Sequence, residues 1–148
     1  MGFFSSVRAT TSGLSAQRVR MDVIGSNIAN MDSTRAANGD GPYRRKVVYF
    51  VDGARAPQFA DMMARFDGRQ NNGVVLTAVG EDDFTPNRIV HNPAHPDADE
   101  EGYVELPNVN LVDEMTDLTS ANRSYQANAT VLNSLKQMAL RALDLGSR

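Results

Sequence analysis

The chain has 148 residues, of which 41% are hydrophobic and 22% are charged, and its formal net charge is −3. These values suit one domain with extensions and a modest core, and the slight acidic excess disfavours a nucleic-acid-binding protein. The chain contains no cysteine, which excludes disulfides, zinc–thiolate sites and cysteine nucleophiles.

Apolar residues are too scattered along the chain for a membrane span. The longest clear apolar run, residues 47–51, is five residues long, whereas a spanning helix needs about 20. The N-terminal segment lacks a basic start and is interrupted by Arg8, so we expect no cleaved signal peptide and no direct membrane insertion.

Residues 1–34 are expected to form an N-terminal helical unit. Large apolar side chains recur every seven positions and so share one helix face: Val7, Leu14, Met21 and Ile28. We expect Ser5 or Ser6 to cap the helix. Two weak helix formers, Gly13 and Gly25, leave two alternatives open. Either a hinge separates two helices, or Gly13 lets another helix approach closely.

Residues 35–107 are expected to form a β-rich middle region with loops. They contain all six prolines, and strand-like runs lie at residues 43–51, 74–79, 88–91 and 103–106. One short helix is predicted from apolar residues at helical spacing, namely Phe59, Met62, Met63 and Phe66. An acidic excess is confined to residues 81–101, which we expect to be a solvated loop.

Residues 108–148 carry the strongest helical pattern. Asn110 can cap this helix, and acidic Asp113 and Glu114 follow where the helix dipole favours them. A first stripe alternates spacings of four and three: Leu111, Met115, Leu118, Asn122, Tyr125, Ala129, Leu132, Lys136, Ala139 and Leu143. A second stripe comprises Val131, Leu135, Met138, Ala142 and Leu145.

Two apolar stripes on one helix imply more than one neighbour. One stripe is expected to face the N-terminal helix, and the other to form an interface, since large exposed apolar patches usually mark one. The alternative is a helix packed on the middle region. We therefore expect an α+β fold whose long N- and C-terminal α-helices pair as a coiled coil, with a Pro/Gly-rich β-containing middle region. The expected assembly interface is Val7, Leu14, Met21, Ile28, Leu111, Met115, Leu118, Tyr125, Leu132, Leu135, Met138 and Leu143.

Few residues suggest catalysis or the binding of a metal or phosphate. One cluster combines metal-ligand residue types, His91, His95, Asp97 and Asp99, but its prolines prevent a shared helical face, so we expect a surface loop. The basic run Arg44-Arg45-Lys46 could bind phosphate, although a salt-bridged surface is the expected outcome. No catalytic residue, cofactor or metal is expected.

Several motifs resemble one protein family over nearly the whole chain. The N-terminal motif comprises Ser12, Gly13, Leu14, Asn27, Ala29 and Asn30, and further matches lie at residues 41–46, 92–99, 102–110 and 123–128. Together they resemble the bacterial flagellar rod, hook and hook-associated proteins, and within that group the proximal rod proteins. Thr34-Arg35 stands where most of the wider group carries Thr-x-Gly-Tyr.

The resemblance implies a non-enzymatic subunit of the basal-body rod, which carries torque from the motor to the hook and is needed for motility. It implies assembly with itself and other rod proteins, and contact with the MS ring and rod adaptor. It also implies synthesis in the cytoplasm, export by the flagellar type III apparatus without a cleaved signal, and a rod spanning the periplasm. Two other interpretations remain: a hydrolase using the His91–Asp99 cluster, and a cytoplasmic coiled-coil adaptor.

Overall fold

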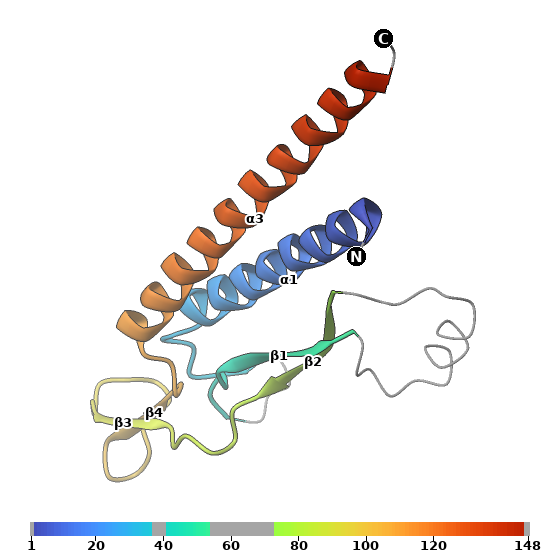
Figure 1. Ribbon diagram of the computed structural model, residues 1–148. Helices are drawn as coiled ribbons and strands as arrows, with labels where there is room; N and C mark the ends of the chain where they lie inside the picture. The colour runs from blue at the N-terminus through green and yellow to red at the C-terminus, as the bar shows by residue number, and fades with distance from the viewer. Residues whose placement is uncertain (1, 37–40, 54–72, 147–148) are drawn as a thin grey trace.

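Two long helices, one from each end of the chain, dominate the structure (Figure 1). The computed structural model describes residues 2–36, 41–53 and 73–146. Helix α1 spans Phe3–Ala29 and helix α3 spans Leu111–Gly146. Small antiparallel strands lie between them in sequence, so the expected α+β class is confirmed.

Helix α3 runs back along α1, and the start of α3 lies beside the end of α1 (Figure 1). Asn27 of α1 bonds Glu114 of α3, and Gly13 faces Asn128. These two contact points are 14 residues apart on α1 (13 to 27) and 14 apart on α3 (114 to 128). The two helices therefore keep one register between these points.

Burial on α3 follows one continuous stripe, which we call the helix seam. Its members are buried or half-buried and alternate spacings of four and three: Glu114, Leu118, Ala121, Tyr125, Asn128, Leu132, Leu135 and Ala139. Among the described helices and strands, α3 packs only against α1. The alternative of a helix packed on the middle region is therefore not observed for the described strands, although Arg45 of that region contacts the first turn of α3.

The helix seam draws on both stripes expected from the sequence. Leu118, Tyr125 and Leu132 come from the first stripe, whereas Leu135 comes from the second. Polar Glu114 and small Ala121 are the most buried members, at 0% and 1% exposure. A prediction based only on large apolar residues therefore misplaces the seam. Its most buried positions hold a small side chain, which allows close helix packing, and a carboxylate with buried partners.

Helix α1 is continuous, which rules out the hinge alternative. At Gly13 an added Cβ would lie 3.0 Å from Asn128 Nδ2, so the close-approach alternative is supported. The expected cap at Ser5 or Ser6 is wrong: the N-cap residue is Gly2, and Ser5 Oγ donates to Gly2 O at 2.6 Å. The helix begins earlier than expected, which places both serines within its first turn.

The α3 N-terminus is capped as expected. Asn110 Oδ1 accepts a hydrogen bond from Val112 N at 3.0 Å. Asp113 and Glu114 occupy the first turn, near the positive end of the helix dipole.

Two hairpin-like sheets make up the described middle region. Strand β1, Lys46–Asp52, pairs antiparallel with β2, Val74–Glu81, and β3, Arg88–His91, pairs antiparallel with β4, Tyr103–Leu106. These strands lie where the sequence predicts them, within a few residues. The helix predicted from Phe59 to Phe66 lies outside the described residues.

The two helical glycines should respond oppositely to substitution. Gly25→Ala should raise the free energy of unfolding by up to about 1 kcal/mol, because alanine favours the helix and nothing lies within 4 Å of the added methyl group. Gly13→Leu should lower it by about 1–3 kcal/mol, because the side chain must displace Asn128. Urea unfolding of both variants checks this. Equal stability of the two variants would contradict the close packing at Gly13.

Candidate functional site: the polar cluster and the exposed helix faces

A buried polar cluster joins α1, β1 and α3. At its centre Asn27 is 1% exposed and Glu114 is 0% exposed. Asn27 Nδ2 donates to Glu114 Oε2 at 3.1 Å and to Lys46 O at 2.9 Å. Asn27 Oδ1 accepts from Tyr43 Oη and from Lys46 N, both at 2.9 Å. All polar atoms of the Asn27 side chain therefore have partners within this cluster.

Arg45 completes the polar cluster. Its Nε donates to Glu114 Oε1 at 2.6 Å, and its guanidinium lies 3.6 Å from Asp117 Oδ2. Partial burial by itself would lower the pKa of Arg45. The hydrogen bond and charge of Glu114, with Asp117 and Asp82, outweigh that burial and raise the pKa. The buried carboxyl group of Glu114 thus has a permanently cationic partner.

The basic run Arg44-Arg45-Lys46 is occupied by contacts within the chain. Arg45 binds the buried Glu114, Arg44 lies 3.7 Å from Asp83, and the Lys46 ammonium lies 5.5 Å from the centre of the Tyr43 ring. The expected salt bridges are therefore observed, at Arg44 and Arg45. The pair at Arg45 lies in the interior, however, and not on a surface as expected.

A second polar contact ties the turn after α1 to the β3–β4 loop. Thr34 Oγ1 donates to Asp97 Oδ2 at 2.7 Å, and Arg35 Nε donates to Asp97 Oδ1 at 2.8 Å. The hydrogen bond from Thr34 and then that from Arg35 lower the pKa of Asp97 below its ordinary value of 3.8. Thr34-Arg35, the departure from the wider family pattern, thus has a partner in the 92–99 motif.

The side chains of metal-ligand type make contacts within the β3–β4 hairpin. His95 Nδ1 accepts from Asp97 N at 3.1 Å, and Asp99 Oδ1 accepts from Tyr103 N at 2.7 Å. The His91 ring packs edge-on against Tyr103. Across residues 2–36, 41–53 and 73–146, no three His, Asp or Glu side chains gather as a metal-binding group.

The N-terminal motif residues have separable structural roles. Ser12 Oγ accepts from Val74 N at 3.0 Å, which joins α1 to β2, and Gly13 allows the approach of α3. Asn27 centres the polar cluster, and Asn30 Nδ2 donates to Ser26 O at the helix end. Leu14 is half-buried and Ala29 is exposed. Sequence reasoning missed Tyr43 and Arg45 as partners of Asn27 and Glu114, because their contacts are long-range.

The expected interface residues fall into a half-buried group and an exposed group. On α1, Val7, Leu14, Met21 and Ile28 are half-buried. On α3, Leu118, Tyr125, Leu132 and Leu135 lie in the helix seam, whereas the remaining four are exposed: Leu111 37%, Met115 56%, Met138 57% and Leu143 70%. Leu140 and Leu145 are also exposed. Exposed apolar side chains therefore lie near both ends of α3, at residues 111–115 and 131–145.

Comparisons with known proteins agree over nearly the whole chain. Residues 100–145 match the family "Flagellar basal body rod FlgEFG protein C-terminal", and residues 8–36 match "Flagella basal body rod protein". The chain is 45% identical over 149 residues to the flagellar basal-body rod protein FlgC of Borreliella burgdorferi, covering 97% of each chain. It is 45% identical to FlgC of Bacillus subtilis, covering 99% of each, and 43% identical to FlgC of Salmonella typhimurium, covering 91% of each. No described helix is long and apolar enough to cross a membrane.

Removing the buried carboxyl group should destabilise the chain strongly. Glu114→Ala leaves Arg45 and Asn27 without their partner, which should cost about 3–5 kcal/mol of unfolding free energy. Urea unfolding followed by circular dichroism measures this. Asp113→Ala, at an exposed position in the same turn, is the control and should cost less than about 1 kcal/mol. Equal losses in the two variants would argue against the cluster.

Stability should fall in acid partly through Asp97. The pKa of Asp97 is lowered in the folded chain. Its contribution to the free energy of unfolding is therefore fully present above the ordinary pKa of an aspartate and is lost as the pH falls through the folded-state pKa. The urea midpoint should therefore drop below about pH 4, and Asp97→Asn should weaken that dependence. Asp22→Asn, at an exposed position on α1, is the control. An Asp97→Asn chain with the unchanged acid profile would refute the assignment.

Proposed function

The chain belongs to the FlgC family of flagellar basal-body rod proteins and is a structural subunit of that rod, and we propose that it polymerises through the exposed faces of its terminal helices. One observation carries the proposal. Helix α3 exposes three large apolar side chains, Met115, Met138 and Leu143, and exposed apolar surface of this kind usually marks an interface.

A stiff drive shaft is the function that the helix arrangement supports best. We propose that α1 and α3 pair as a coiled coil within the rod. Two observations support this pairing. The contact points are equally spaced on the two helices, and the positions of the helix seam alternate spacings of four and three. Packed helices resist bending and twisting, as the transmission of motor torque to the hook requires.

The wider assembly is part of the same proposal. The subunit contacts copies of itself, other rod proteins, and the MS ring and rod adaptor at the base. It is made in the cytoplasm, exported by the flagellar type III apparatus without a cleaved signal, and placed in a rod that spans the periplasm. The chain is non-enzymatic and works through three units, residues 1–34, 35–107 and 108–148. The absence of cysteine is consistent with export, because no disulfide can trap the chain.

A substitution at the exposed residue Leu143 tests assembly without disturbing folding. Leu132 lies in the helix seam, so an aspartate there would also damage the monomer. Leu143 is 70% exposed, so Leu143→Asp should leave the monomer folded. Within an assembled interface, however, it would bury an unpaired carboxylate at a cost of several kcal/mol.

We expect cells carrying Leu143→Asp in place of the natural chain to export the protein but to lack completed rods and motility. Immunoblots of isolated basal bodies and swimming assays measure this. Arg141→Asp, two residues away and already polar, is the matched control and should be milder. Normal swimming of the Leu143→Asp strain would refute this interface, and absence of the natural chain from basal bodies would refute the rod assignment.

A further inference from the structure

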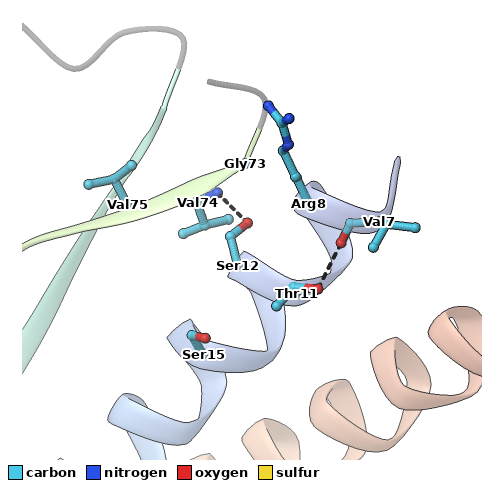
Figure 2. A pocket seen from close by; sticks show the side chains of 8 residues that line it. All are labelled: Val7, Arg8, Thr11, Ser12, Ser15, Gly73, Val74 and Val75. Atoms are coloured by element: carbon cyan, nitrogen blue, oxygen red, sulfur yellow. Dashed lines mark hydrogen bonds between the residues drawn. The ribbon is translucent and has the colours of Figure 1, made fainter. Parts of the chain in front are cut away.

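A pocket lies between the N-terminal half of α1 and the start of β2, and we call it the α1–β2 pocket (Figure 2). Its volume is about 420 Å³, within the size range of sites that hold a small ligand. Apolar parts of its lining come from Val7 and Thr11 of α1 and from Val74 and Val75 of β2. The hydrogen bond from Val74 N to Ser12 Oγ joins its two walls, as Figure 2 shows.

The walls of the α1–β2 pocket carry apolar surface that is in contact with solvent. Val74 and Val75 are 39% and 36% exposed. Phe4 is 75% exposed and precedes Thr11 by seven residues, so it lies on the pocket side of α1, beside the N-terminal edge of the pocket. A partner that fills the pocket would bury this apolar surface, which favours binding.

The chain leaves β1 and returns to β2 at the edge of this pocket. Gly53 N donates to Gly73 O at 2.7 Å, and Gly73 itself lines the pocket. An added Cβ at Gly73 would collide with Ser12 Oγ and lie 3.7 Å from Ala9 Cα, so the start of β2 rests directly on α1. Residues 54–72, which lie outside the described part of the chain, are therefore tethered at the pocket by both ends.

The sequence of residues 54–72 supplies the apolar side chains that the pocket requires. Its large apolar residues fall at i, i+3, i+4 and i+7, the spacing of one helix face: Phe59, Met62, Met63 and Phe66. Phe59 is six residues from Gly53, and Phe66 is seven residues from Gly73. Each of these stretches spans up to about 20 Å at roughly 3.3 Å per residue. The apolar residues can therefore reach the pocket from both anchors.

The tether favours this segment over a second molecule as the partner of the pocket. A partner joined by a short flexible linker acts at an effective concentration in the millimolar range. The side chains are also suitable, because methionine adapts to an irregular apolar gap and an aromatic ring buries a large area. A separate molecule would lack the advantage of the tether.

We propose that residues 59–66 dock in the α1–β2 pocket of the same chain through Phe59, Met62, Met63 and Phe66. The contact strengthens the packing of the β1–β2 hairpin on α1, since a two-stranded hairpin is marginally stable by itself. The inference goes beyond the proposed polymerisation, because it concerns a contact within one subunit. It assigns the α1–β2 pocket to the subunit itself, and the exposed side chains of α3 remain for neighbouring copies.

The absence of natural cysteines allows a direct test by cross-linking. The purified full-length chain carries Met63→Cys together with either Thr11→Cys in the pocket or Asp22→Cys as the control. Asp22 is exposed on the same helix, about three turns from Thr11 and outside the pocket lining. During oxidation, the intramolecular disulfide should form at least about tenfold faster with Thr11→Cys than with Asp22→Cys. Equal rates, or disulfide-linked dimers as the main product on non-reducing gels, would overturn the proposal.

Trypsin digestion tests the same contact without cysteines. Residues 54–72 contain three sites for trypsin, Arg55, Arg65 and Arg69. Val75→Asp places a carboxylate in the pocket lining, so it should release the segment and speed cleavage at these arginines by about tenfold. The matched control is Val79→Asp, on the same strand but outside the pocket lining. Val79 is 46% exposed, so its substitution should change the rate by less than about twofold.

Mass spectrometry of the first cleavage products measures these rates, and circular dichroism checks that both variants are folded. Equal cleavage rates in the natural chain and in Val75→Asp would overturn the docking of this segment. Failure of the contact would leave the rod function standing, because that function is judged by the presence of the natural chain in basal bodies.

Discussion

The structure depends on one buried carboxyl group, that of Glu114. Water does not reach it, so its hydrogen bonds must come from the protein, and Arg45 and Asn27 provide them. Asn27 in turn binds both the amide and the carbonyl of Lys46 at the start of β1. One cluster therefore joins the end of α1, the start of β1 and the first turn of α3. Displacing any of the three elements would leave a buried polar group without a partner.

That constraint sets the rotation of α3. With Glu114 turned inward, residues at heptad spacing from it, such as Ala121 and Asn128, also face α1. Met115, the residue after Glu114, then lies outside the helix seam and is 56% exposed. The same cluster thus encloses one face of α3, while apolar side chains near both ends of the helix stay exposed. In a polymer, a subunit with a fixed helix register presents the same outward face at every position.

Much of the fold follows from local signals. The strand-rich runs, the Asn110 cap and the extent of both helices are governed by contacts within a few residues, and each lies close to its predicted place. Sequence reasoning failed where the contact is distant. It assigned Ser5 or Ser6 as a cap because both are good capping residues, but the helix begins at Phe3. It treated Glu114 only as a residue favoured by the helix dipole, although Arg45, 69 residues away, is its partner.

The sequence by itself determined the family, the two terminal helices and the order of the strands, because motifs, heptad spacing and β-branched runs act locally along the chain. Only the tertiary structure decided which face of α3 is covered and which partner each buried polar group has. It also decided that Thr34 and Arg35 bind Asp97. The physical reason is that a buried polar group must find a partner in space, and sequence spacing carries no record of which distant residue folds beside it.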